Sequence, residues 1–228
     1  MIDYIIPEPA KTFLPVKDSQ SVFPVRRVYC IGRNYAEHAR EMGHDPDRDP
    51  PFFFQKNPDN IVTDGSFKYP TKSENVHHEV EMVVALKSGG NSIPVGLANQ
   101  HIFGYCIGLD MTRRDLQQHA KTMGRPWEIG KAFENSAPFG KLVPVENTGI
   151  IEKGAISLKI NQTIRQSADI SQMIWSVPEM ISILSDYFEL AAGDVIMTGT
   201  PAGVGSVQTG DVMLAFIEGL GELEVLVN

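Results

Sequence analysis

Short runs of β-branched, aromatic and other apolar residues dominate this chain of 228 residues and limit the folds that it can adopt. Runs of this length and composition are typical of β-strands. They cover residues 27–31, 52–55, 80–86, 102–109, 156–160, 194–198, 212–217 and 222–227. Because the runs do not alternate regularly with helices, they argue against a doubly wound parallel sheet and predict a β-rich α+β fold.

The longest expected helix spans residues 177–190. Ser176 and Glu179 have the spacing of a capping box at its start. Apolar residues follow at helical spacing, so this helix is expected to pack on the sheet. Those residues are Met180, Ile181, Leu184, Tyr187 and Phe188.

Two other helices are expected nearer the N-terminus. Residues 113–123 should form one, with Thr112 and Asp115 as its capping box. Residues 35–42 should form a short one that ends at a glycine. The segment 43–51 after it is rich in Asp, Pro and Arg and should be an exposed loop that can act as a lid.

Length and composition favour a single globular domain, since a chain of this size can bury a core without disulfides. Residues 1–24 contain four prolines among short apolar pairs. We expect them to be an extended, irregular lead-in lying over one domain of residues 25–228. Cys30 and Cys106 lie within apolar runs and should be buried, reduced thiols.

The formal net charge of −8 argues against nucleic acid or an anionic membrane as a partner, because neither would be attracted at long range. No apolar run approaches the roughly 20 residues needed to span a bilayer. The first thirty residues also lack the basic start and apolar stretch of a signal peptide. We therefore expect a cytoplasmic protein that acts on small molecules.

Two glutamates lead into the run 80–86. Side chains alternate along a strand, so Glu79 and Glu81 should share one face with Val83 and Ala85. Both faces of this strand are apolar beyond the glutamates, which predicts burial on both sides. Like charges at the edge of a core need a positive partner, and a hard divalent cation with oxygen ligands is an efficient one.

Asp110 offers a third carboxylate at the end of the run 102–109. It follows the face that carries Gly104, Cys106 and Gly108, which are small enough for another element or a ligand to approach closely. A Glu-x-Glu pair alone also fits the solvent face of an edge strand, which is the commoner case. The metal interpretation therefore depends on the rest of the chain.

Three carboxylates around a divalent cation leave a net charge of −1, which would repel an acidic substrate. A basic side chain is therefore expected to compensate. The candidates that flank the acidic and histidine segments are Arg33, Lys56, Arg113, Arg114 and Lys131.

His38 and Glu41 are three residues apart on the expected short helix, close enough for the carboxylate to orient the imidazole. Such a pair can act as a general base at physiological pH. Taken alone, it also fits an ordinary contact on a helix surface. The glycine-rich segment 197–205 fits either a turn or a loop that contacts an anion, and Thr200 is its candidate contact.

Together, these motifs resemble the fumarylacetoacetate hydrolase family, and most closely its short acylpyruvate and fumarylpyruvate hydrolases. The resemblance extends from about residue 26 to residue 227. Its motifs are GRNYAEHAREM (32–42), FFFQK (52–56), HHEVE (77–81), DMTRRDLQ (110–117), GKAF (130–133) and TGTPAGVG (198–205).

The resemblance implies a mixed β-sandwich roll with a few short helices, assembled as a homodimer. It implies Mg²⁺ or Mn²⁺ held by the residues that match Glu79, Glu81 and Asp110, with Lys131 reaching the site. His38 and Glu41 match the residues that activate water. Gln117 and Thr200 match substrate contacts, to which we add Arg33 and Arg114. Residues 38–51 match the lid.

The implied reaction is metal-dependent hydrolysis of the C3–C4 bond of a small anionic 2,4-dioxo acid. Fumarylpyruvate would give fumarate and pyruvate in the breakdown of aromatic acids. The same resemblance covers oxaloacetate decarboxylases and isomerases or hydratases of unsaturated dioic acids. An alternative of a different class is a non-catalytic β domain with a structural Ca²⁺ at the acidic residues.

Overall fold

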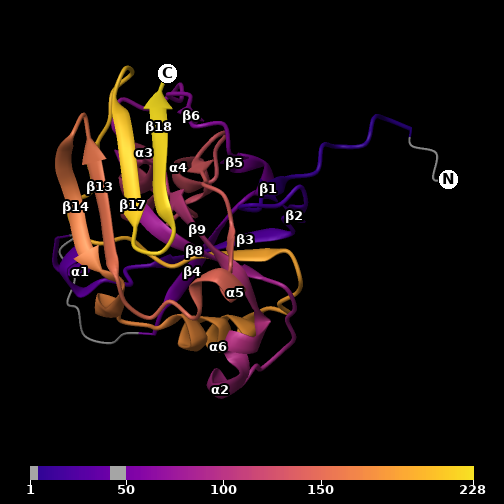
Figure 1. Cartoon of the computed structure of the whole chain (residues 1–228). Helices are drawn as coiled ribbons and strands as arrows, with labels where there is room; N and C mark the ends of the chain where they lie inside the picture. The colour runs from indigo at the N-terminus through magenta and orange to yellow at the C-terminus, as the bar shows by residue number, and fades with distance from the viewer. Residues whose placement is uncertain (1–4, 42–49) are drawn as a thin grey trace.

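The computed structural model of the chain describes residues 5–41 and 50–228, and most of their strands belong to two large sheets (Figure 1). The first sheet contains, in spatial order, β12 (Val143–Pro144), β9 (Ile102–Leu109), β8 (Val80–Leu86), β15 (Asp194–Met197), β3 (Arg27–Gly32) and β4 (Phe52–Lys56). The second contains β14 (Thr163–Asp169), β13 (Ala155–Ile160), β17 (Val212–Ile217), β18 (Gly221–Val227) and β6 (Ser66–Phe67). Both sheets mix parallel and antiparallel pairs.

Smaller strand groups complete the fold. They are β1 (Phe13–Pro15) with β2 (Val22–Pro24), β5 (Ile61–Val62) with β11 (Ala137–Pro138), and β7 (Val76–His78) between β10 (Thr112–Arg113) and β16 (Gly205–Ser206). Each run expected to be a strand is one, within a residue at either end. Strand β14 was not expected, because its residues are mostly polar and exposed. The β-rich α+β prediction is confirmed.

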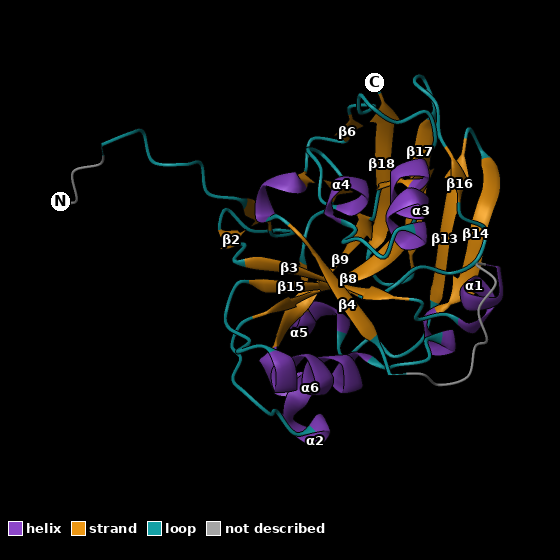
Figure 2. Cartoon of the chain, turned by 180° about the vertical axis from the view of Figure 1, so that it is seen from behind, coloured by secondary structure: helices purple, strands orange, loops and turns teal. Residues whose placement is uncertain are grey.

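The helices pack around the two large sheets. Figure 2 shows α6 (Val177–Tyr187) and α2 (Val95–Ala98) below the six-stranded sheet. The other α-helices of the described residues are α1 (Ala36–Glu41), α3 (Arg114–Thr122), α4 (Glu128–Lys131) and α5 (Val145–Thr148). Short 3₁₀ helices cover Pro58–Asn60, Asn99–His101 and Ile170–Gln172. None of the described helices is long and apolar enough to cross a bilayer.

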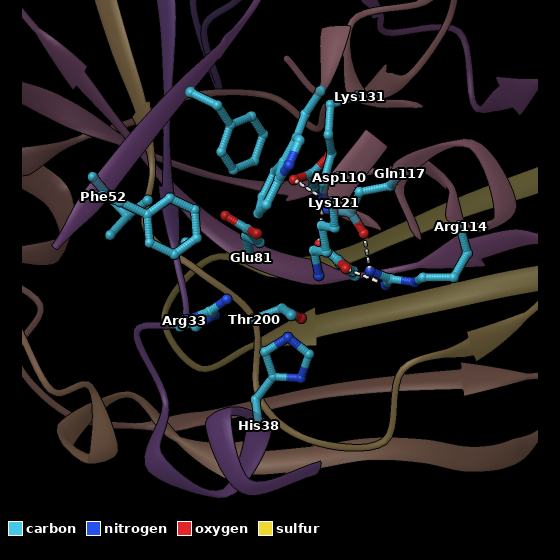
Figure 3. A pocket seen from close by; sticks show the side chains of 15 residues that line it. Arg33, His38, Phe52, Glu81, Asp110, Arg114, Gln117, Lys121, Lys131 and Thr200 are labelled. Carbon is cyan, nitrogen blue, oxygen red and sulfur yellow. Dashed lines mark hydrogen bonds and ion pairs between the residues drawn. The ribbon is translucent and has the colours of Figure 1, made fainter. Parts of the chain in front are cut away.

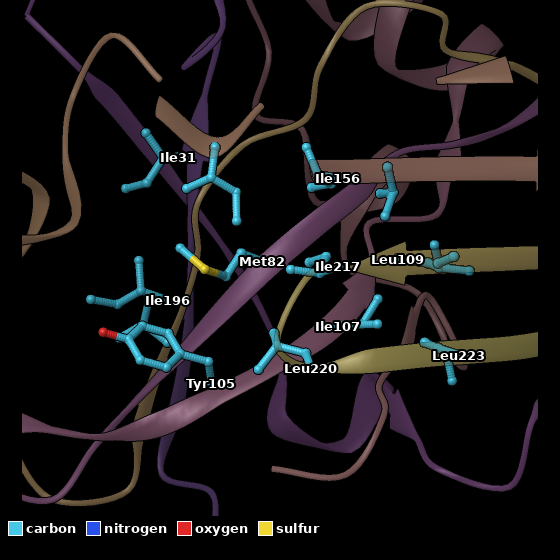
Figure 4. Close-up of a cluster of buried hydrophobic side chains, with 14 of the residues drawn as sticks. Ile31, Met82, Tyr105, Ile107, Leu109, Ile156, Ile196, Ile217, Leu220 and Leu223 are labelled. Atoms are coloured by element: carbon cyan, nitrogen blue, oxygen red, sulfur yellow. The ribbon is translucent and has the colours of Figure 1, made fainter. Parts of the chain in front are cut away.

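Strand β8 is buried along its whole length, as predicted, and its two faces contact different cores. Met82 and its neighbours on one face join the core between the two large sheets, where Figure 4 shows Ile107, Ile156 and Ile217 beside it. Val83 and Ala85 on the other face join a smaller core. Each fully buried aliphatic side chain of this size contributes about 1.5–3 kcal/mol relative to exposure.

The small residues on β9 allow close packing, as expected. A Cβ added to Gly104 would lie 2.2 Å from the carbonyl oxygen of Val143, and one added to Gly108 would lie 2.6 Å from Val83 and 2.8 Å from Phe139. Another part of the chain, rather than a ligand, therefore occupies this space. Cys30 and Cys106 are buried free thiols, also as expected.

Two details of the helices differ from expectation. Helix α3 lacks the Thr112–Asp115 capping box, because the Asp115 carboxylate instead accepts hydrogen bonds from the Ser73 hydroxyl at 2.7 Å and from the Glu74 N–H at 3.0 Å. Helix α6 does begin with the Ser176–Glu179 box. Met180, Ile181 and Leu184 of this helix are buried in the larger core, as expected. The helix ends at Tyr187 rather than at Leu190, and the Tyr187 side chain is mostly exposed.

The N-terminal segment is more structured than an irregular lead-in. Residues 5–11 are exposed and extend away from the body (Figure 1), so they do not lie over it. Strands β1 and β2 pair as a hairpin that buries Leu14 and Phe23 in the smaller core. The domain boundary at residue 24 stays a prediction. Most of the expected lid, residues 42–49, lies outside the described residues.

Candidate metal centre and catalytic pocket

The acidic residues meet where β7 turns into β8 and where β9 ends. Glu79 lies between β7 and β8, Glu81 lies in β8, and Asp110 follows β9. The antiparallel β8–β9 ladder continues past its last pair, since the Asp110 N–H donates to the Glu79 carbonyl at 2.8 Å. One carboxylate oxygen from each of the three residues lies within 4.8 Å of the others. All three side chains are buried.

Among the residues that the structure describes, three basic side chains form ion pairs with this carboxylate triad (Glu79, Glu81 and Asp110). Lys131 Nζ lies 2.7 Å from both Glu79 Oε2 and Asp110 Oδ2. Lys56 Nζ lies 2.9 Å from Asp110 Oδ1, and Arg114 pairs with Glu79 Oε1. The expected compensating charge is therefore present. Lys56 was a candidate cation but was not assigned to the site from the sequence.

The charges are not evenly balanced within the triad. Burial alone would raise the pKa of Glu79, but Lys131 and Arg114 outweigh it and hold that pKa far below its usual value. Burial, followed by the neighbouring Asp110 and Glu79, raises the pKa of Glu81 well above its usual value. Glu81 is thus the carboxylate of the triad whose charged form its surroundings disfavour most.

The donor set fits a divalent metal ion. It offers three hard carboxylate oxygens within coordinating reach of one another, and burial and the acidic neighbours disfavour the charged form of one of them, Glu81. Oxygen-only ligands of this kind suit Mg²⁺ and Mn²⁺ better than softer metals. The triad is therefore able to hold such an ion.

The glycine-rich loop after β15 supports the triad. The Gly199 N–H donates to Glu81 Oε2 at 2.8 Å. Gly199 has φ of +93°, and a Cβ there would lie 2.7 Å from the Asn34 side chain, so a larger residue would displace this donor. Thr200 donates its hydroxyl proton to the Val80 carbonyl at 2.8 Å and accepts from Gln166 at 2.7 Å. Its hydroxyl therefore mainly joins the loop to β8.

The predicted His38–Glu41 pair forms on α1. His38 Nδ1 lies 3.1 Å from Glu41 Oε2, and His38 lines the same pocket as the triad (Figure 3). The Gly203 N–H donates to both carboxylate oxygens of Glu41 at 3.1 Å. Glu41 thus connects the helix that carries His38 to the loop that contacts Glu81.

Asn34 connects three segments beneath this site. Its buried amide donates to the Trp175 and Thr198 carbonyls at 2.9 and 2.8 Å and accepts from the Trp175 N–H at 2.7 Å.

Replacing Asn34 by alanine would leave these backbone groups of Trp175 and Thr198 unpaired. We therefore expect the free energy of unfolding to fall by about 1–3 kcal/mol or more. Urea denaturation would measure it. The exposed Asn91→Ala serves as the control, and equal stability of the two variants would contradict this role.

Helix α3 presents one face to the pocket. Arg114 and Gln117 are both on it, and Arg114 donates to Gln117 Oε1 at 2.7 Å, which leaves the Gln117 amide nitrogen able to donate to a ligand. Arg33 also lines the pocket. Arg113 does not: it stacks over the Phe133 ring at 4.3 Å and donates to the Ile129 carbonyl.

Several pocket residues were not expected from the sequence. They are Lys121, Phe52, Phe54 and Trp127. Lys121 could have been found, because it follows Arg114 by seven residues and Gln117 by four, which is one face of a helix. The aromatic residues carry no such signal, since they resemble ordinary core positions.

Comparison with known proteins agrees with this geometry. The family model described as fumarylacetoacetate (FAA) hydrolase C-terminal matches residues 27–228. Fumarylpyruvate hydrolase from Ralstonia sp is 41% identical over 178 residues, which are 78% of this chain and 92% of that protein. Human mitochondrial oxaloacetate tautomerase is 37% identical over 195 residues, which are 86% of this chain and 88% of that protein.

A solved structure extends the match. Fumarylpyruvate hydrolase from Pseudomonas aeruginosa, crystallised with Mn²⁺ and pyruvate, is 51% identical, with a TM-score of 0.96 over 99% of each chain. The family match and these relatives cover nearly the whole length of the described fold. The chain therefore belongs to the fumarylacetoacetate hydrolase family.

Proposed function

We propose that this protein is a metal-dependent hydrolase that cleaves the C3–C4 bond of 2,4-dioxo acids, with fumarylpyruvate as a substrate that yields fumarate and pyruvate. One observation carries the proposal: the carboxylate triad and His38 line the same pocket, so a metal site and a candidate base face one ligand. The names of the Ralstonia and Pseudomonas relatives support the same substrate.

The basic residues would prepare the pocket for an acid. Glu79, Glu81 and Asp110 would hold the metal, and Lys131 would offset their charge beside the pyruvyl half of the substrate. A bound Mg²⁺ or Mn²⁺ would act as a Lewis acid that orients and polarises the 2-oxo acid. Arg114 would hold Glu79 in place and position Gln117, whose amide would donate to substrate oxygen.

His38 would act on the acyl half. With Nδ1 bonded to Glu41, Nε2 is the nitrogen left to take a proton from water. That water would attack C4, the C3–C4 bond would break, and the proton held by His38 would be available to C3. Glu41 would stabilise the imidazolium that forms between the two steps.

Turnover by the purified protein tests the proposal. With Mg²⁺ or Mn²⁺ we expect fumarylpyruvate to lose its enol absorbance while pyruvate appears, measured with coupled lactate dehydrogenase. Chelation should stop the reaction, and added metal should restore it. Oxaloacetate is tested in parallel because of the relationship to oxaloacetate tautomerase. Inactivity on every acylpyruvate would overturn the hydrolase proposal.

The homodimer and the division into a lead-in and one catalytic domain of residues 25–228 belong to the same proposal. Light scattering after size-exclusion chromatography would measure the mass of the assembly. A monomer at the concentrations of the activity assay would contradict the dimer but not the reaction.

A further inference from the structure

Helix α3 contributes three residues to the pocket. Arg114 and Gln117 serve its metal-binding end, and the third is Lys121. Arg114, Gln117 and Lys121 lie at spacings of three and four residues and all line the pocket (Figure 3). Arg114 is committed to Glu79 and to Gln117. Lys121 is on the next turn of the helix and is not part of either contact. It is therefore a separate cation on the same wall.

The surroundings of Lys121 favour an anion. Its side chain is half-buried, with Nζ 5.0 Å from the centre of the Trp127 ring. Among the described residues, no carboxylate lies within ion-pair distance of it. Burial, followed by the nearby Arg114 and Arg33, lowers the pKa of Lys121 to about 8. A carboxylate placed here would relieve that repulsion.

Arg33 reaches the same region from another element. It follows β3 with φ of +58°, a left-handed conformation that is costly for a residue with a side chain. Its guanidinium lies 5.2 Å from the centre of the Phe52 ring, and both residues line the pocket. Strained backbone of this kind concentrates at functional sites.

The pocket continues toward this basic region. Arg33, Lys121 and Trp127 also line an adjoining hollow that includes Arg125, and no acidic residue is among the described residues around it. Of the cations around this hollow, Arg33 and Lys121 also line the pocket of the triad, whereas Arg125 does not. A ligand with one carboxylate at the metal site of the triad and a second beside Arg33 and Lys121 would match both regions.

We propose that Lys121 and Arg33 bind the distal carboxylate of a dicarboxylic 2,4-dioxo acid, and that they select such substrates over acylpyruvates with an uncharged acyl group. The inference rests on the proposed function. In fumarylpyruvate the distal carboxylate is three bonds beyond the carbonyl carbon that water attacks, so it can extend past His38. Oxaloacetate ends at the corresponding carbon and lacks this group.

Two substrates that differ at one position test the selection. They are fumarylpyruvate and the same molecule with a methyl group in place of the distal carboxylate. Losing one hydrogen bond to a charged group corresponds to about a 10- to 100-fold change. We therefore expect Lys121→Met to lower kcat/KM that much more for fumarylpyruvate than for the methyl analogue, mainly through KM. Lys121→Arg should keep most of the preference.

The matched control is Arg125→Met, which removes an exposed cation that lines the adjoining hollow but not the pocket of the carboxylate triad. It should leave the preference between the two substrates unchanged. Equal losses on both substrates in Lys121→Met would overturn the inference, because they would indicate a general structural effect.

Binding provides a readout that does not require turnover. Fumarate and crotonate differ only in the distal carboxylate, and each can be titrated into the Mg²⁺-loaded protein while tryptophan fluorescence is followed. Tighter binding of fumarate that is lost in Lys121→Met would support the inference even if no acylpyruvate were cleaved, in which case only the proposed function would fail. No preference in the wild type, or a preference that survives in Lys121→Met, would overturn the inference.

Discussion

Replacing Glu81 by glutamine is expected to remove activity while making the metal-free protein more stable. The glutamine oxygen can still accept from the Gly199 N–H, so the loop should keep its position. The variant loses one of the three negatively charged candidate ligands of the metal. We therefore expect turnover to fall roughly a thousandfold, which is the size of effect seen when an enzyme loses a major group that stabilises charge in the transition state. Calorimetric titration with Mn²⁺ should show weaker binding.

The gain in stability follows from the raised pKa of Glu81. Burial, Asp110 and Glu79 all penalise its charged form. The folded metal-free protein therefore keeps a proton that the unfolded chain has released, and its stability falls as pH rises above the ordinary value of 4.5. Glu81→Gln should lack this loss. Its melting temperature without metal should rise by about 2–4 °C for each kcal/mol of repulsion removed.

The exposed Glu222→Gln is the matched control, since it removes one negative charge far from the triad and should change neither property. A Glu81→Gln variant with normal Mn²⁺ affinity would contradict the metal assignment. If metal-free Glu81→Gln were less stable than the metal-free wild type, the electrostatic explanation would be wrong.

The carboxylates were predictable because their arrangement depends on local geometry. Strand periodicity was sufficient to place Glu81 on the face that continues as Val83 and Ala85 and to predict burial of both faces. Predicting that Glu79 and Asp110 lie together would also have required the antiparallel register of β8 and β9. The small residues of β9 predicted a close approach by another element or a ligand, and the structure shows that it is the chain itself.

The basic partners were not predictable in the same way, because distant parts of the chain determine them. Arg113 and Arg114 are adjacent and chemically identical, yet one stacks on Phe133 and the other pairs with Glu79. Lys56 and Lys131 reach Asp110 from different elements. The failed capping box at Asp115 has the same cause, since its carboxylate has partners 41 and 42 residues away.

Replacing His38 by alanine is expected to separate two reactions of the same pocket. Hydrolysis of an acylpyruvate requires an activated water, and losing a positioned general base lowers the rate by about 10²- to 10⁴-fold. Loss of carbon dioxide from oxaloacetate requires no attacking water, so any such activity should fall much less. Both rates would be measured on one metal-loaded preparation, with pyruvate as the common product.

Two further variants make the His38 result specific. His119→Ala removes an exposed histidine from α3 and should change neither rate. Glu41→Gln keeps an oxygen that can accept from His38 Nδ1 and from the Gly203 N–H, but it cannot stabilise the imidazolium by charge. It should therefore reduce hydrolysis, by less than His38→Ala, and hardly affect decarboxylation. An equal reduction of both reactions in His38→Ala would mean that His38 does not act only by activating water. The division of the pocket into an end that binds the metal and the pyruvyl half and an end that activates water at the acyl half would then be wrong.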